Sequence, residues 1–215
     1  MPSIPIDYPI EYWYTKRFRL AFYTQDQPCL LSGSYNGKAP LFLGVFSSTP
    51  EDVRENSFTW FVSAGTSQQY KDFTWKLDSS NRKWLVPAFD SGSKIEILWL
   101  ASHRFMSKDL IETTGNYIHA TYSSGYANTF ELERIKGCGN HKYTISLADN
   151  KFGGAGQVGW KMTPEKPSQQ SYSKAWQRDE DSYYVHARKC DDAEEVQQNA
   201  HYGKPRHVWR LEPVP

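Results

Sequence analysis

Two short segments carry residues of the types and spacing that bind metal ions. Cys138 precedes His141 by three positions, and His186 precedes Cys190 by four. Thiolates and imidazoles at such spacings can chelate zinc in a tetrahedral site. Isolated pairs of this kind also arise by chance. Small zinc domains need the metal because they lack a hydrophobic core. A chain of 215 residues can bury such a core without a metal. We therefore predict no metal site.

The glycines at positions 154, 156 and 159 match the G-x-G-x-x-G fingerprint of dinucleotide-binding proteins. That site requires a helix directly after the turn, so that the helix N-terminus meets the pyrophosphate. Pro164 and Pro167 follow too closely for such a helix to form. We predict a glycine-rich β-turn here and no cofactor.

Nucleophilic catalysis needs a Ser or Cys beside a His that a carboxylate orients. Ser34, between Gly33 and Gly37, stands one position early for a G-x-S-x-G elbow, and neither a parallel sheet nor a following helix is evident. A thiolate of Cys29 or Cys138 acting with one of six histidines is an open alternative. The sequence predicts no catalytic residue and a non-enzymatic protein, with a small enzyme as an alternative.

Aromatic residues beside polar turns give the remaining chemical hint, because 15% of the chain is aromatic, with 8 Trp and 14 Tyr. A ring packs on the apolar face of a sugar while nearby Asn, Asp, Gln or His side chains bond its hydroxyls, usually at surface loops. The predicted ligand-binding residues are Tyr35, Asn36, Trp99, His103, Asn116, Tyr117, Asn150 and Trp160. Tyr35 and Tyr117, on turns, are preferred. An aromatic residue on an alternating strand is more often a core residue than a ligand-binding one, so Trp60, Phe130 and Trp209 are assigned to the core.

Charge and length exclude several classes of protein. The 25 basic and 24 acidic residues give a net charge of +1, without the basic excess typical of nucleic-acid binding. The N-terminus lacks a basic region followed by an apolar run, and no apolar stretch reaches the roughly 18 residues of a membrane span. Three scattered cysteines do not form a disulfide framework. We expect one cytoplasmic domain over residues 1–215, and the sequence makes no prediction about oligomeric state.

Alternation of apolar and polar residues dominates the chain and predicts strands. Three opening strands stand out by apolar residues at every second position: Phe18, Leu20, Phe22; Ile95, Ile97, Trp99; and Tyr143, Ile145, Leu147. Short helical turns are expected only at residues 50–55 and 191–198, which carry acidic residues in their first turn. The expected fold class is all-β.

An internal repeat accompanies the alternation. Residues 59–62, 129–132 and 208–211 share one form: a β-branched residue, an aromatic residue, a variable residue and an aliphatic residue. Together with the opening strands they predict three modules, over residues 16–65, 93–136 and 141–213. Residues 74–77 repeat the form a fourth time and are assigned, with a strand at 84–89, to an inserted hairpin at 69–91. Residues 163–181 are expected to form a polar surface loop.

This threefold pattern resembles the β-trefoil superfamily, in particular its fungal lectin-like and fascin-like members. The segment 95–135 carries the resemblance best, with strands expected at 95–102, 108–115, 116–122 and 129–135. The Gln-x-Trp triplet of ricin-B-type lectins is absent from the sequence. A two-sheet β-sandwich explains the alternation equally well but not the repeat.

The resemblance implies a binding protein, and we expect a carbohydrate-binding lectin similar to the cytoplasmic defence lectins of fungi. The first alternative is a protease inhibitor on the same scaffold, acting through the loop 163–181 or the loop 47–56. A fascin-like cytoskeletal binder is a further alternative.

Overall fold

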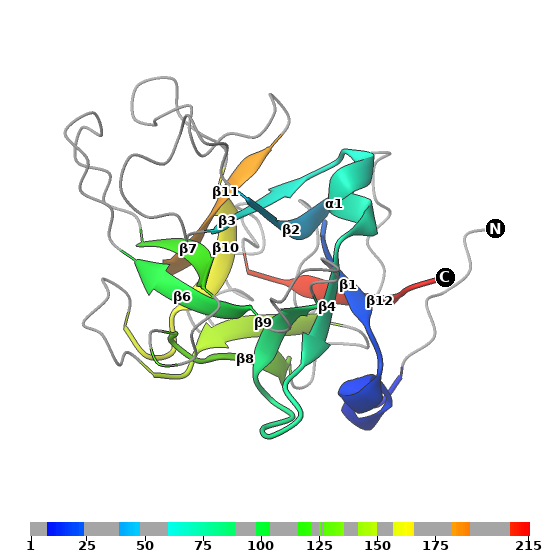
Figure 1. Cartoon of the computed structure of the whole chain (residues 1–215), viewed down its shortest axis with the longest axis horizontal. Helices are drawn as coiled ribbons and strands as arrows, with labels where there is room; N and C mark the ends of the chain where they lie inside the picture. The colour runs from blue at the N-terminus through cyan, green and yellow to red at the C-terminus, as the bar shows by residue number, and fades with distance from the viewer. Residues whose placement is uncertain are drawn as a thin grey trace, which may run out of the picture.

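The structure is a computed structural model that describes residues 8–23, 39–47, 60–88, 98–103, 116–121, 125, 127–135, 142–149, 157–165, 182–189 and 207–215. It is all-β, as expected, with a small share of helix (Figure 1). The elements are η1 (Ile10–Thr15), β1 (Phe18–Phe22), β2 (Leu41–Ser47), β3 (Trp60–Gly65), α1 (Gln68–Asp72), β4 (Thr74–Leu77), β5 (Leu85–Ala88), β6 (Trp99–His103), β7 (Asn116–Thr121), β8 (Phe130–Arg134), β9 (Lys142–Leu147), β10 (Lys161–Glu165), β11 (Tyr183–Arg188) and β12 (Trp209–Pro213).

Seven of the strands close into a ring by antiparallel pairing. The ring runs β1, β2, β3, β11, β10, β9 and β12, and the pairing of β12 with β1 closes it. The ring therefore brings the first and last described strands side by side, with Leu20 opposite Leu211 (Figure 1). Closure of this kind removes exposed sheet edges.

Hairpins attach the remaining strands to this ring. β4 pairs with β1 and β5, β6 pairs with β7, and β8 pairs with β9. The strands β3, β7 and β11 also pair with one another in all three combinations. The described strands thus form one continuous antiparallel network rather than separate units.

Alternation along the strands directs one face of each into a common core. In β1 the side chains of Phe18 and Leu20 are fully buried, and in β9 those of Ile145 and Leu147 are as well. Both strands were predicted from their apolar residues at every second position. The largest buried side chains come from strands far apart in sequence, including Trp75 of β4 and Trp209 of β12. Burial of such side chains is the main favourable term in folding.

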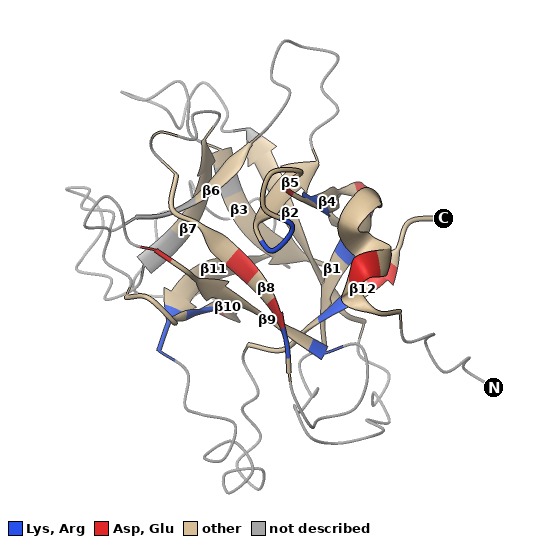
Figure 2. Cartoon of the chain, turned by 90° about the horizontal axis from the view of Figure 1, so that it is seen from below, with Lys and Arg blue, Asp and Glu red and all other residues tan. Residues whose placement is uncertain are grey.

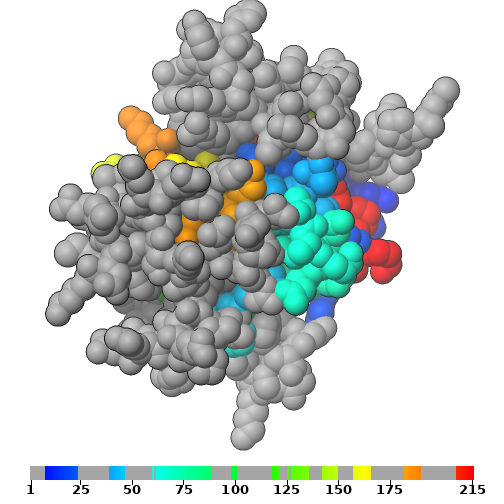
Figure 3. Space-filling view, turned by 90° about the horizontal axis from the view of Figure 1, so that it is seen from above, coloured from blue at the N-terminus to red at the C-terminus, as the bar shows by residue number. Residues whose placement is uncertain are grey.

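A second, smaller cluster lies under the helix α1. The Tyr70 ring is fully buried and packs with Ala21 and Phe42, and the Tyr70 hydroxyl lies 2.7 Å from Ser63 Oγ. A side chain at Gly65 would come within 2.5 Å of the Tyr70 ring, so the close approach requires glycine there. Seen from above, part of the segment 60–88, which carries α1, lies at the surface beside part of the segment that carries β11 (Figure 3).

Some expected elements differ from the observed ones. Trp99 is half-buried while its neighbours Leu98 and Leu100 are buried, so Trp99 lies on the strand face opposite to the core. Trp60, assigned to the core, is half-buried and packs against it, whereas Phe130 and Trp209 are buried as predicted. The helices η1 and α1 were not predicted.

Other expectations fall on segments with little or no description. The expected strand at 108–115 and the helical turns at 50–55 and 191–198 lie outside the described residues. Of the loop expected at 163–181, only 163–165 are described, and they belong to β10.

Candidate functional site

Seven of the eight tryptophans lie in the described residues, and they differ in their relation to the core; Trp176 lies outside the described residues. Five either lie in the core or pack against it: Trp13, Trp75, Trp209, Trp60 and Trp160. Trp84 and Trp99 are half-buried and belong to neither core cluster. Their ring centroids are 6.2 Å apart with an angle of 73° between the planes, an edge-to-face contact. Among the described tryptophans, these two, which we call the indole pair, are the ones that lie outside both core clusters.

A hydrogen-bonded turn fixes Trp84 at the start of β5. The Trp84 carbonyl accepts from Asp78 N–H at 2.8 Å, and its own N–H donates to the Asn81 carbonyl at 2.9 Å. The Asp78 carboxylate in turn accepts from the backbone N–H groups of Ser80 and Asn81, at 2.9 and 3.0 Å. Such side-chain bonds to nearby backbone stabilise tight turns. The backbone at Trp84 is therefore fixed by hydrogen bonds within the chain and needs no ligand to order it.

Trp99 is held by the β6–β7 hairpin. It is the first residue of β6 and lies opposite Thr121 of β7. Since successive side chains of a strand point to opposite faces, burial of Leu100 places the Trp99 indole on the outer face.

Polar residues of the next strands continue from Trp84 in one row. Trp84 forms a bridge with Glu131 of β8, Glu131 lies opposite Ser146 of β9, Ser146 opposite Lys161 of β10, and Lys161 opposite Arg188 of β11. Directly opposed residues of antiparallel strands share a face. The row therefore joins an indole, a carboxylate, a hydroxyl and two cations on the outer face. The acidic positions of β8 and the basic residues of neighbouring strands are visible in Figure 2.

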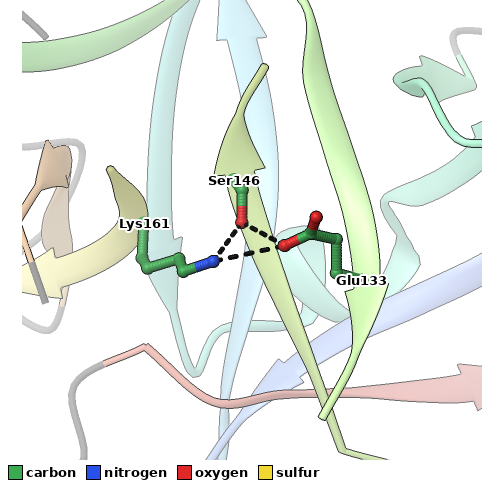
Figure 4. A network of polar contacts seen from close by, with 3 residues as sticks. All are labelled: Glu133, Ser146 and Lys161. Atoms are coloured by element: carbon green, nitrogen blue, oxygen red, sulfur yellow. Dashed lines mark hydrogen bonds and ion pairs between the residues drawn. The ribbon is translucent and has the colours of Figure 1, made fainter. Parts of the chain in front are cut away.

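Three residues of this region form a polar network (Figure 4). Ser146 Oγ donates to Glu133 Oε2 at 2.8 Å, and Lys161 Nζ donates to Ser146 Oγ at 2.5 Å and to Glu133 Oε2 at 3.2 Å. Burial alone would raise the pKa of Glu133. The hydrogen bond from Ser146 and the charges of Lys161 and Lys83 outweigh it, so that the pKa of Glu133 lies below its usual value. The network holds Glu133 as a charged acceptor.

The geometry of the network suits binding and positioning better than nucleophilic chemistry. A serine nucleophile needs a neutral base to take its proton. Here the neighbouring Lys161 donates a hydrogen bond to Ser146 and forms an ion pair with Glu133, so its amine does not act as an acceptor for the serine proton. The Ser146 residue is also only 5% exposed.

A second group of charges lies at the far end of the row. The Arg188 guanidinium forms an ion pair with the Glu165 carboxylate, and His186 Nε2 lies 3.8 Å from Glu165 Oε2. His186 is fully buried, and burial together with the charge of Arg188 lowers its pKa to about 3. Neutral His186 is therefore a structural residue of β11 at ordinary pH.

The predicted ligand-binding residues divide into four groups. His103 lies opposite Tyr117 in the β6–β7 hairpin, and Asn116 is adjacent at the start of β7, so the backbone brings these three positions together. Trp99 is at the other end of that hairpin, in the indole pair. Trp160 is half-buried against the core on the β9–β10 turn. The remaining three lie outside the described residues: Tyr35, Asn36 and Asn150.

Sequence reasoning missed Trp84 and Glu131. Trp84 was placed in a hairpin regarded as an insertion, and Glu131 was the variable position of a repeat. The available signal was the polar run 78–83 immediately before Trp84, which predicts a surface turn and thus an indole near solvent.

The glycine motif and the candidate zinc ligands lie partly within the described residues. Gly159 has a φ of 89° and belongs to a turn that leads directly into the strand β10, as predicted, instead of a helix. Of the four candidate zinc ligands only His186 is described, and the described residues contain no group of three or more His, Cys, Asp or Glu able to hold a metal ion. Within the same residues, no helix has the length and apolar character needed to cross a membrane.

No family model matches the chain and no curated protein matches it, so its function is inferred from the fold and from the surface around the indole pair.

Proposed function

We propose that this protein is a β-trefoil lectin that binds carbohydrate at the indole pair, Trp84 and Trp99, and the adjoining carboxylate of Glu131. The observation that carries the proposal is the position of these two half-buried indoles, outside both core clusters and beside a polar row.

Strand pairing supports the trefoil. A trefoil combines six barrel strands with three hairpins, and equivalent pairings recur three times. β1 pairs with β4 and β9 with β12, while β5 meets β8 through the Trp84–Glu131 bridge. The pairs β12–β1, β4–β5 and β8–β9 link these units. The hairpins β2–β3, β6–β7 and β10–β11 then meet through the mutual pairing of β3, β7 and β11.

Core residues at equivalent positions support the same proposal. Trp75 in β4, Phe130 in β8 and Trp209 in β12 occupy the aromatic position of the repeated sequence form, and all three are buried. Trp75 Nε1 donates to the carbonyl of Leu43 in β2 at 2.8 Å, and Trp209 Nε1 donates to that of Met162 in β10 at 3.0 Å. In a trefoil, β2 and β10 are equivalent strands. A β-sandwich gives no reason for this correspondence.

The proposal assigns module boundaries that differ from those expected from the sequence. The three modules comprise β1–β4, β5–β8 and β9–β12. The hairpin expected as an insertion at 69–91 then becomes the junction between the first two modules, with β4 closing one and β5 opening the next.

The chemistry of the surface supports a sugar ligand. An indole face covers the apolar C–H face of a pyranose, and a charged carboxylate accepts hydrogen bonds from its hydroxyls. Ser146, Glu133 and Lys161 continue the row with further donors and acceptors. Because the strands and the turn fix the backbone positions, binding would lose little free energy to ordering of the chain.

A glycan array with the purified chain tests the proposal. We expect binding that falls at least tenfold in the variants Trp84→Ala and Trp99→Ala, since stacked aromatic residues carry much of the energy of such sites. Trp160→Ala is the matched control, because Trp160 is also half-buried but packs against the core. Circular dichroism establishes that each variant is folded.

Other results would favour the alternative functions. A chain that ignores every glycan but forms a stable complex with papain-like or trypsin-like proteases would be an inhibitor. A chain that fails both assays but sediments with actin filaments would be a cytoskeletal binder. Loss of binding in Trp160→Ala, with retention in Trp84→Ala, would move the sugar site to the β9–β10 turn.

A further inference from the structure

Glu131 differs from the two other glutamates along the polar row, Glu133 of β8 and Glu165 of β10. The carboxylate of Glu133 pairs with Lys161 at 3.2 Å, and that of Glu165 pairs with Arg188. Within the described parts of the chain, no hydrogen bond or ion pair reaches the Glu131 carboxylate. Glu131 is half-buried, so part of its hydration is already lost. A cationic ligand group would compensate that charge.

The neighbours of Glu131 also favour a cation. Glu131 is the direct cross-strand partner of Trp84, whose ring meets that of Trp99 at 73°. The two rings pack edge to face, and indole faces attract ammonium groups through their negative π clouds. Directly opposed residues of antiparallel strands have Cβ atoms about 5 Å apart. A single ammonium group can therefore contact both the carboxylate and an indole.

We propose that the carbohydrate bound here carries a protonated amino group, as in oligomers of glucosamine, and that Glu131 selects for it. This inference rests on the proposed lectin function and adds the class of sugar. The amino group forms an ion pair with the Glu131 carboxylate and a cation–π contact with an indole, while the pyranose ring packs against the indole pair. Acetylation of the amine removes the charge and both of these interactions.

Two ligands that differ only in acetylation provide the test: a glucosamine oligomer and the N-acetylglucosamine oligomer of the same length, titrated into the purified chain by calorimetry. We expect the amino oligomer to bind about tenfold more tightly at a pH where its amines are protonated. Raising the pH until the amines lose their protons should abolish the preference. The affinity for the acetylated oligomer should not change over the same range.

The variant Glu131→Gln removes the charge and keeps the shape. It should lose the preference for the amino oligomer and retain the affinity of the native chain for the acetylated one. Glu11→Gln, at an exposed position of η1, is the matched control, because it changes the net charge equally without altering the row. It should keep the full preference, which excludes general attraction between a polycation and the protein.

The outcomes separate the two proposals. Equal affinity of the native chain for the two oligomers, or a preference that survives in Glu131→Gln, overturns the amino-sugar inference and leaves the lectin proposal standing. Absence of binding to either oligomer and to every glycan of the array overturns both. The comparison of the two oligomers needs no variant, so it remains decisive if Glu131→Gln does not fold.

Discussion

The two buried indole hydrogen bonds that link the strands of the core make a sharp prediction about stability. Trp75 and Trp209 are both fully buried, and each donates from Nε1 to a main-chain carbonyl of another strand, at 2.8 and 3.0 Å. Replacement by Phe keeps an aromatic ring in the core but removes the donor. Trp75→Phe leaves the Leu43 carbonyl without this partner, and Trp209→Phe does the same to the carbonyl of Met162.

The expected loss has two parts. Leaving a buried acceptor without its donor costs about 1–3 kcal/mol. The smaller ring also buries less apolar surface and leaves a void, which costs about 1–2 kcal/mol more. Each variant should therefore lower the free energy of unfolding by about 2–5 kcal/mol, a large part of the roughly 5–15 kcal/mol of a typical domain.

Urea denaturation followed by far-ultraviolet circular dichroism measures this loss independently of tryptophan fluorescence. Trp160→Phe is the matched control, since its half-buried indole should lose about 1 kcal/mol or less. If Trp75→Phe and Trp209→Phe are no less stable than the control, the two bonds do not hold the strands together. Similar losses in the two variants are expected because the proposed trefoil makes their positions equivalent.

Three further predictions concern the turn before β10 and the titrating groups of the outer face. Gly159→Ala should lower the free energy of unfolding by about 1 kcal/mol in urea, because φ is 89° there, and Gly159→Asn should lower it less. As the pH falls from 6.5 toward 3, stability should decrease by up to about 1.4 kcal/mol per pH unit. The unfolded chain binds a proton at His186 that the folded chain refuses, and His186→Gln should reduce the slope in urea titrations. The pKa of Glu133 is lowered from 4.5 on folding, so its contribution is present above that pH and lost below it; Glu133→Gln should be less stable at neutral pH and show a smaller acid loss.

Alternation in the sequence was sufficient to identify the strands whose core face is regular. β1 and β9 each place apolar side chains at every second position, and those side chains are buried. In β6 the same rule fails. Trp99 continues the apolar series of Ile95 and Ile97 in the sequence, yet Leu98 and Leu100 are the buried residues and the indole faces outward.

The repeated sequence form identified strands that carry a buried aromatic residue, but it selected residues 59–62, whereas the fully buried ring belongs to residues 74–77. Residues 59–62 and 74–77 both fit it. Trp75 is fully buried with a hydrogen-bonded indole, whereas Trp60 is half-buried at the start of β3. The form describes an aromatic residue two positions before an aliphatic one. It does not contain the information on which strand lies opposite, and that pairing decides which ring enters the core.

The candidate site was only partly predictable for a related reason. Trp99 was among the ligand-binding residues predicted from the sequence. Trp84 and Glu131 lie opposite each other only because Trp84, just before β5, forms a bridge with β8. Cross-strand neighbours of this kind are distant in sequence, and a pattern within one segment cannot reveal them. The sequence analysis favoured aromatic residues on turns, whereas Trp84 and Glu131 are brought together by a bridge between strands.

The charges of the outer face explain why one glutamate is available to a ligand. Lys161 and Arg188 are directly opposed on β10 and β11, and like charges in that position destabilise a sheet. Each has its own carboxylate, Glu133 for Lys161 and Glu165 for Arg188, so the pairing is compensated in the folded chain. Glu131 belongs to the same row, but its cross-strand neighbours are an indole and a hydroxyl. A ligand ammonium at Glu131 would supply there the compensation that lysine and arginine supply to the other two carboxylates.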